Sequence, residues 1–330
     1  MRRVGPVLAT LLAAVTPDVS HAQECLRAPS LEELVTCVVE HMPNRGSRRV
    51  EAANARTLAA VRATARVMLG GRCDRAALPP ALAGSFALTP FRDAASGESF
   101  CLLLAAADRD GDGVDDLGWG MFLVRRHAPR ELHLQVPHPY FDFGTELQGA
   151  TLMRASGARS LLMAGAHRQA SMTASACQPE YCRSDAAHDT ALPFHAITEA
   201  ILAHHERRGQ DFAVLQLHSF GPDGCPGVDV HVSDGTAQPP PAGAPARRVR
   251  DALAARKPGW TITVSGDEPP CHLHGAGNVQ GRLLNGVPAA QVCTRRATRA
   301  GGRFLHAEQK LHACDAAAWA AAIAEAWPAR

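Results

Sequence analysis

Four apolar runs of this sequence end on a histidine or an acid, and these ends hold the side chains best suited to chemistry. The runs are residues 132–138, 161–167, 212–218 and 304–308, and their last residues are His138, His167, His218 and Glu308. Strands of an open α/β sheet bring their carboxyl ends to one edge, where binding sites lie. Two histidines and a carboxylate can hold zinc with one position left for water, and a separate glutamate can accept a proton. The pattern therefore predicts a zinc site suited to hydrolysing an amide bond.

The predicted zinc ligands are His138, Asp142 and His218. Zinc needs an acidic oxygen beside the imidazoles, and both Asp142 and Glu146 follow His138 closely. We favour Asp142 because a helix is expected to begin at Thr145, and a carboxylate in its first turn is already stabilised by the helix dipole. Glu146 stays open as the alternative third ligand. Hydrogen-bonded structural histidines are the alternative explanation for both imidazoles.

Two further side chains are expected near this site. Arg168 follows the strand that ends at His167, and its fork of donors suits a substrate carboxylate or a developing oxyanion. A surface salt bridge explains Arg168 equally well. His188 lies in the polar segment 184–189, which is expected to form a loop over the site. The segment 271–274, Cys-His-Leu-His, is interpreted as structural or as site wall because a cysteine in a disulfide cannot bind zinc.

The acidic segment 108–116 is a candidate calcium site. Asp108, Asp110 and Asp112 alternate along it, and Gly113 stands where a calcium loop needs a glycine. Position twelve of such a loop would be Trp119 rather than an acid, which excludes a complete EF-hand. A charged hairpin tip explains the segment at least as well.

From residue 131 onward, strand and helix patterns alternate. Strands are expected up to residue 137 and at 160–166, 212–218, 228–232, 261–264 and 303–307, with helices at 145–154, 193–207, 246–256 and 315–327. This alternation predicts an α/β fold with a mostly parallel or mixed sheet and helices on both faces.

The preceding residues predict a small helical and hairpin N-terminal segment, residues 23–130, ahead of a hydrolytic α/β domain over 131–330. Ser30 and Glu33 form a capping box that opens a helix ending at Glu40, and a second helix is expected at 50–69. The runs 100–106 and 119–124 predict the two strands of a β-hairpin.

The first 22 residues are typical of a secretory signal peptide. Arg2 and Arg3 precede the apolar run 7–15, and Ser20 and Ala22 are small residues ahead of a cleavage site. The apolar run is too short to cross a bilayer. We therefore expect no membrane span and export to the periplasm or the medium after cleavage near Ala22.

Composition and cysteine content agree with an exported globular protein. The chain has 330 residues, of which 46% are hydrophobic and 20% charged, and its net charge of +2 comes without a long basic block, so nucleic acid is not an expected partner. All ten cysteines lie beyond residue 22, and we expect them to form disulfides. The simplest connectivity pairs neighbouring cysteines, with Cys177 and Cys182 closing a small loop.

The site residues resemble those of the zinc carboxypeptidase-like hydrolases, in particular the branch that includes N-formylglutamate amidohydrolase and poly-gamma-glutamate hydrolase. The likeness is a strand-ending His138, an acid soon after it, a later His218 and a last-strand Glu308, within residues 132–309. It implies a zinc-carboxypeptidase-like fold, zinc held by His138, Asp142 and His218, and Glu308 as general base. One departure is the spacing, since Asp142 comes four residues after His138 and the carboxypeptidases have the acid three residues after.

The resemblance also implies a set of substrate-binding polar groups. These are Arg168 together with Asn278 and Arg282. A small peptide or amide would be the substrate, and export suggests cell-wall peptide, extracellular peptide or polyglutamate. Two other functions stay open, a zinc esterase or phosphoesterase with the same metal site, and a non-catalytic secreted binding protein with an enzyme-like fold.

Overall fold

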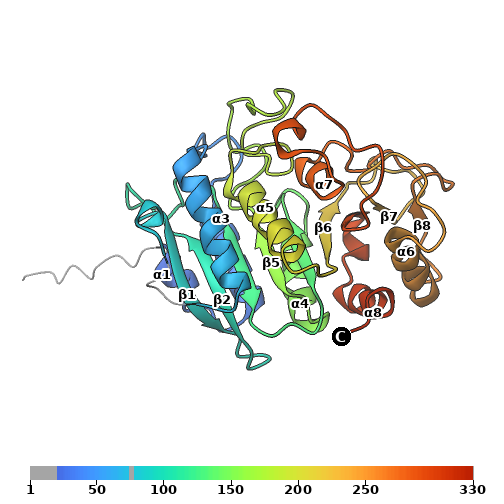
Figure 1. The fold of residues 1–330 in the computed structure, drawn as a ribbon, viewed down its shortest axis with the longest axis horizontal. Coiled ribbons are helices and arrows are strands. Elements are labelled where there is room, and N and C mark those ends of the chain that lie inside the picture. Colours follow the sequence, from blue (N-terminus) through green and yellow to red (C-terminus); the bar gives the residue numbers. More distant parts are fainter. Residues whose placement is uncertain (1–20, 74–77, 330) are drawn as a thin grey trace, which may run out of the picture.

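A single nine-stranded sheet forms the centre of the computed structural model, which describes residues 21–73 and 78–329 (Figure 1). The strand order is β1-β2-β3-β5-β4-β6-β9-β7-β8. Strands β5, β4, β6 and β9 run parallel, whereas β1 to β3 and the β7–β9 pair are antiparallel. Helices cover both faces, so the predicted α/β fold with a mixed sheet is confirmed. The predicted signal peptide lies almost wholly outside the described residues.

The strands have these bounds: β1 Phe86–Arg92, β2 Ser99–Ala105, β3 Met121–Arg125, β4 Leu132–Val136, β5 Ser160–Met163, β6 Ala213–Ser219, β7 Val230–Ser233, β8 Ile262–Val264 and β9 Phe304–Gln309. The helices are α1 His21–Cys25, α2 Leu31–Glu40, α3 Ala55–Leu69, α4 Thr145–Ala155, α5 Pro193–Glu206, α6 Pro245–Arg256, α7 Val279–Leu284 and α8 Ala316–Ala326. Short 3₁₀ turns lie at Pro80–Leu82, Ala289–Gln291 and Leu311–Ala313. Among the described elements, strand β1, helices α1 and α7 and the 3₁₀ turns are those that the sequence patterns did not predict.

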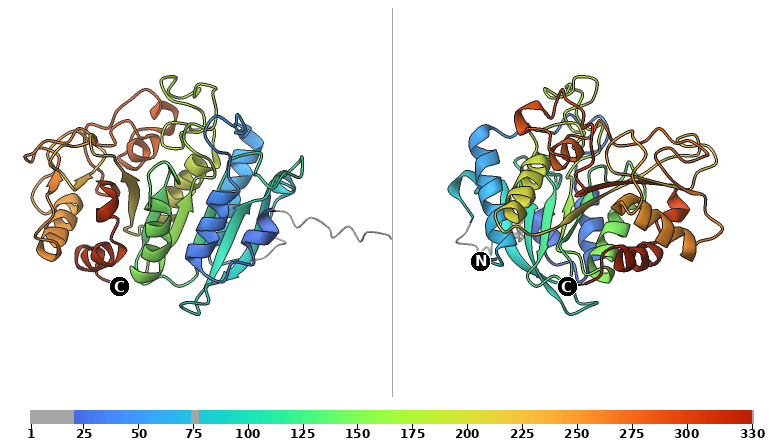
Figure 2. Two further views of the ribbon diagram at one scale, coloured as in Figure 1. Left: turned by 180° about the vertical axis from the view of Figure 1, so that it is seen from behind. Right: turned by 45° about the vertical axis from the view of Figure 1, so that its right-hand side comes forward.

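Two apolar layers hold the helices to the sheet, one on each face. Helices α3 and α5 pack on one face, and α2, α4, α6 and α8 pack on the other, as the front and rear views show (Figures 1 and 2). Every residue of β4 and β5 is buried. Burial on both faces is what the continuous apolar runs of parallel strands require. Among the described residues no helix is long and apolar enough to cross a bilayer.

Side-chain caps set the starts of the N-terminal helices. One half of the predicted capping box is present, since Ser30 Oγ accepts a hydrogen bond from the Glu33 amide. The Glu33 carboxylate accepts from the Ser30 hydroxyl, whereas the box would have it accept from the Ser30 amide. Helix α3 begins at Ala55 rather than at residue 50, because Asn54 accepts a hydrogen bond from the Thr57 amide and so closes the helix at that point.

The predicted β-hairpin between residues 100 and 124 is confirmed as β2 and β3. Strand β3 also pairs antiparallel with β5. The strands of the N-terminal segment therefore extend the same sheet that the later residues build.

Four disulfides join Cys25 to Cys37, Cys73 to Cys101, Cys177 to Cys293, and Cys225 to Cys271. The expected Cys177–Cys182 loop is wrong. Cys177 lies against the segment after α7 and bonds Cys293, 116 residues away, while Cys182 pairs through its backbone with Ala174. Cys182 and Cys314 are free thiols, so the expectation that all ten cysteines form disulfides is wrong for these two. Four disulfides in one chain indicate an oxidising compartment.

Candidate metal centre and active site

The candidate centre lies at the carboxyl ends of the parallel strands. His138 lies two residues after the end of β4, His218 is the second-last residue of β6, and Glu308 is in β9. His218 and Glu308 are direct partners in the β6–β9 register, so both side chains leave the same face of the sheet. The edge predicted from the sequence is thus where these three residues meet.

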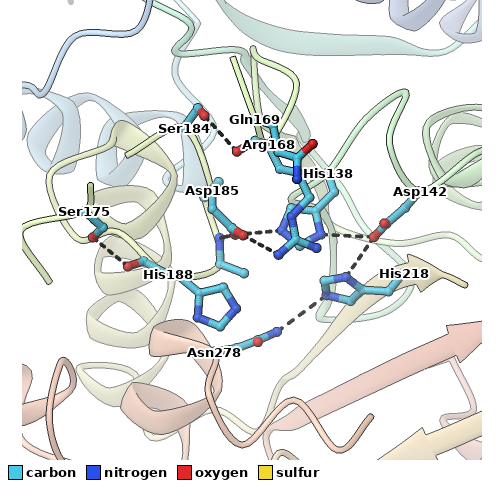
Figure 3. A network of polar contacts seen from close by, with 12 residues as sticks. His138, Asp142, Arg168, Gln169, Ser175, Ser184, Asp185, His188, His218 and Asn278 are labelled. Carbon is cyan, nitrogen blue, oxygen red and sulfur yellow. Dashed lines mark hydrogen bonds and ion pairs between the residues drawn. The ribbon is translucent and has the colours of Figure 1, made fainter. Parts of the chain in front are cut away.

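His138, Asp142 and His218 converge on a common point (Figure 3). The Nδ1 atoms of His138 and His218 lie 3.1 Å and 2.9 Å from Asp142 Oδ2. All three side chains are buried, and their possible ligand atoms lie within 4.8 Å of one another. The structure therefore brings together the three side chains that were predicted as zinc ligands.

The other ring nitrogen of each histidine is held by an oxygen. His138 Nε2 lies 2.8 Å from Asp185 Oδ1, and His218 Nε2 lies 3.0 Å from Gln216 Oε1. An imidazole that donates Nε2–H to such an oxygen keeps the lone pair of Nδ1 free. Outer hydrogen bonds of this kind orient the histidine ligands of metal sites. The two rings are therefore arranged to present Nδ1 to a shared ion.

The local charges favour a cation at this point. Burial by itself lowers the pKa of His138, but the carboxylates of Asp185 and Asp142 outweigh it and raise this pKa above its ordinary value. His138 in turn helps to keep the pKa values of both carboxyl groups low despite their burial. Two imidazoles and a carboxylate are also the donor types that zinc prefers. A divalent cation thus fits the residues present.

A tight turn delivers Asp142 to the site. The Asp142 amide donates to the His138 carbonyl at 2.9 Å, and Tyr140 adopts a left-handed φ of 65° that is unusual for a residue with a side chain. The alternative ligand Glu146 lies in the first turn of α4, where its carboxylate accepts a long contact of 3.5 Å from the Tyr140 amide. Glu146 is not among the converging atoms, so the geometry favours Asp142.

Glu308 forms a second group with His218 and His306, whose possible ligand atoms also lie within 4.8 Å of one another. Its Oε1 lies 3.5 Å from His306 Nε2. Burial, followed by the nearby Asp142 charge, raises the pKa of Glu308 well above its usual value, and Arg168 opposes this rise. A positive ion among the three converging side chains would oppose it further.

Of the predicted substrate-binding residues, Arg168 and Asn278 lie beside the centre. Arg168 forms an ion pair with Asp185 and lies 5.0 Å from the ring of Phe141. Asn278 donates to Gln216 Oε1, the same atom that holds His218. Each of these side chains is therefore linked to a candidate ligand through one intervening residue, Arg168 to His138 through Asp185 and Asn278 to His218 through Gln216.

The structure places His188 and Arg282 differently from the expectation. His188 is buried rather than overhanging the site, stacked 3.5 Å from the Tyr181 ring and hydrogen-bonded to Gln178. Arg282 is buried too, and its guanidinium donates to the backbone carbonyls of residues 276, 292 and 293. Arg282 does not line the cleft.

A cleft of about 1150 Å³ opens beside the centre. Asp142, His218 and Glu308 line it together with Arg168. This volume is slightly above the range of about 300–1,000 Å³ that is usual for small-molecule pockets, and it is large enough for several residues of a peptide.

In the acidic segment, the three acids that lie closest together are not quite the predicted calcium trio. Asp108 and Asp110 converge with Asp116, whereas the Asp112 carboxylate turns to the Arg49 guanidinium at 2.7 Å. Arg49 also contacts Asp110 at 3.0 Å, so the loop already has a cation of its own.

Sequence reasoning did not find Asp185, Gln216 and His306 as parts of the site. Asp185 was visible only as one acid in the polar segment 184–189, and its contact with His138 depends on how that loop folds back. Gln216 precedes His218 by two residues, and this period-two spacing is the signal that places both on one face of a strand. The same spacing relates His306 to Glu308.

No protein-family model matches the chain, and a search of curated protein sequences finds no significant match. Two of the solved structures that match this chain are only loosely similar to it. The product of gene Atu2144 of Agrobacterium tumefaciens is 16% identical at a TM-score of 0.35, over 59% of this chain and 87% of that chain. A "putative carboxypeptidase" of Burkholderia mallei is 12% identical at a TM-score of 0.36, over 73% of this chain and 62% of that one.

Proposed function

We propose that this chain is an exported zinc-dependent hydrolase of peptide or other amide bonds. The observation that carries the proposal is the convergence of two histidine Nδ1 atoms on the Asp142 carboxylate, with each opposite nitrogen held by a buried oxygen. His138, Asp142 and His218 would hold the ion, and three protein ligands leave a position open as in catalytic zinc sites. When bound, zinc supplies Lewis-acid activation of water and of the substrate carbonyl.

Glu308 is assigned as general base. It is the acid on the neighbouring strand that faces the same cleft but is not needed as a ligand. A carboxylate in this place takes the proton from the attacking water and returns it to the leaving amine. Its burial keeps bulk water away from the proton that it moves.

Arg168 is assigned to the substrate carbonyl or carboxylate. Its guanidinium lines the cleft, and the ion pair with Asp185 fixes its orientation. Preorganised donors stabilise the charge that develops on the carbonyl oxygen during attack. Asp185 would thus hold both His138 and Arg168 in place.

A two-metal phosphoesterase is the second candidate, because His218, His306 and Glu308 form a group that could hold another ion. Many such enzymes use two ions about 3.5–4 Å apart. Metal stoichiometry separates the two functions, since the amide hydrolase needs one ion and leaves Glu308 free. A non-catalytic binding protein would tolerate loss of Glu308 altogether.

The test is Glu308→Gln, compared with Glu146→Gln as a matched control on α4. Wild type and both variants are assayed by mass spectrometry on a mixture of synthetic peptides, with zinc content measured alongside. In Glu308→Gln, turnover should fall by about 10²–10⁴-fold while zinc content stays at the wild-type level. Loss of zinc would make Glu308 a ligand, and unchanged turnover would remove its role as base. Glu146→Gln should keep both zinc and turnover.

A further inference from the structure

Large apolar side chains are exposed around the cleft. Six such side chains are strongly exposed among the described residues: Tyr140, Phe141, Phe143, Leu147, Met172 and Leu311. Three of them, Phe141, Phe143 and Leu311, line the cleft beside Asp142 and Glu308. Single exposed apolar residues are ordinary, but a cluster rimmed by polar groups marks a binding surface.

The backbone that carries Asp142 also sets out this cluster. The left-handed turn at Tyr140 directs Asp142 inward, where it is buried, and leaves Phe141 and Phe143 exposed by 40% and 59%. Ser219 Oγ donates to the Phe143 carbonyl at 3.2 Å, which ties this loop to the end of β6. Strained backbone is concentrated at binding and catalytic sites. The turn at Tyr140 therefore indicates that the candidate metal ligand Asp142 and the exposed pair Phe141 and Phe143 serve the same site.

The cleft has further apolar lining. Phe220 and Leu273 line it, from the segments after β6 and after the Cys225–Cys271 disulfide. Leu311 lies beside the Phe143 loop, so close that a methyl group added at Gly144 would come within 3.1 Å of it. Apolar walls with a few converging polar groups at one end are typical of pockets that bind a substrate side chain.

The cationic groups of the cleft already have acidic partners. Arg168 pairs with Asp185, and Asp229 pairs with both Lys310 at 3.2 Å and His312 at 3.4 Å. A surface that recognises a row of carboxylates needs positive charge in excess. The cleft is therefore poorly suited to a polyglutamate chain, which the sequence had left among the expected substrates.

We infer that the substrate carries a large apolar side chain, aromatic or branched aliphatic, in the residue next to the scissile amide. This side chain packs against Phe141, Phe143 and Leu311 in the cleft. Cleavage of that amide rests on the proposed function, whereas the binding preference does not, so the two can be tested separately.

The probes are three tripeptides with capped ends, Gly-Phe-Gly, Gly-Glu-Gly and Gly-Gly-Gly. Their dissociation constants are measured by NMR titration of the full chain carrying Glu308→Gln, so that turnover does not interfere. The phenylalanine peptide should bind about tenfold or more tightly than the glycine peptide, and the glutamate peptide no more tightly than the glycine peptide. Adding Phe143→Ala or Leu311→Ala should remove most of this preference. Met172→Ala, an exposed apolar residue outside the cleft, is the matched control and should keep it.

Equal binding of the phenylalanine and glycine peptides, tighter binding of the glutamate peptide, or a preference that survives Phe143→Ala and Leu311→Ala would overturn the inference. Phe143-dependent binding to phosphatidylcholine vesicles, with no preference among the peptides, would assign the cluster to a membrane surface and overturn it as well. A phenylalanine preference in a protein that hydrolyses none of the peptides with zinc bound would sink the proposed function and leave this inference standing.

Discussion

Asp142 is the central residue of the candidate metal centre, because both histidines contact it. Both histidine Nδ1 atoms approach the same oxygen of its carboxylate, and its pKa is kept low by their contacts although it is buried. The carboxylates of Asp142 and Asp185 favour a positive ion at this point, and the nearby guanidinium of Arg168 is already paired with Asp185. A bound cation therefore explains the cluster better than a structural hydrogen-bond network does.

Asp142→Ala should abolish zinc binding, whereas Glu146→Ala should leave it intact. The reason is geometric, because Asp142 contacts both imidazoles and the Glu146 carboxylate contacts the Tyr140 amide instead. Zinc content after purification without chelator gives the comparison, and circular dichroism checks the fold. The reverse pattern would move the third ligand to Glu146.

Asp185→Asn should weaken zinc binding by about 10–100-fold without unfolding the chain, as is typical for groups that orient a ligand. Competition with a colorimetric zinc chelator measures the affinity. Asp189→Asn is the matched control, since Asp189 is buried in the same loop but accepts from the Ala191 amide and does not contact His138. Equal affinities for wild type and Asp185→Asn would show that Asp185 does not position His138.

At the scale of elements, helix α5 is attached to β4 through a buried pair of histidines. His133 Nε2 lies 2.8 Å from His205 Nε2, and the ring of Phe212 stacks on His205 at 4.4 Å. Burial and neighbouring positive groups lower the pKa of His205 to about 3 and that of the adjacent His204 to about 4. The folded chain therefore holds these rings neutral.

Acid should therefore loosen this attachment. A histidine whose folded pKa is depressed contributes stability that is complete above its unfolded pKa of about 6.5 and is lost as the pH falls below it toward the folded value. The melting temperature should be lower at about pH 5 than at about pH 7.5, and His205→Gln should reduce this difference. The exposed His127→Gln should not change it. A melting temperature that stays constant over this range would contradict the assignment.

The elements that carry His138, His218 and Glu308 could be predicted because each is a continuous apolar run, and burial on both faces of a parallel strand produces that pattern. Asp185 could not be predicted in the same way. Its place depends on a long loop whose path is fixed by tertiary contacts such as the Cys177–Cys293 disulfide. The antiparallel pairing of β7 with β9 is likewise a property of the whole sheet, which no local pattern encodes.

For the whole molecule, the disulfides cross-link N-terminal helices as well as loops near the candidate centre. Cys25–Cys37 joins α1 to α2, and Cys177–Cys293 joins the loop that carries Asp185 to the segment after α7. The second of these closes the longest loop, which in the chain-entropy model restricts the unfolded state most. The site loops are therefore held by more than packing.

Two thiols per chain should react in denatured, unreduced protein, because eight of the ten cysteines are bonded and Cys182 and Cys314 are not. In the native protein Cys314 should react slowly, since burial raises the pKa of its thiol to about 12. Thiol titration before and after denaturation measures both. Cys177→Ser should add one titratable thiol by releasing Cys293, and finding most cysteines free would remove the evidence for an oxidising compartment.

The decisive measurement for the proposed zinc centre is the zinc content of the wild type, His138→Ala and His218→Ala, each purified without chelator. We expect about one zinc per chain in the wild type. We expect little or none in either variant, with the fold retained, because an open catalytic site on a rigid sheet adds less to folding than a closed structural site. Full zinc occupancy in both histidine variants, or no zinc in a folded wild type reconstituted with the metal, would rule out zinc binding by His138 and His218.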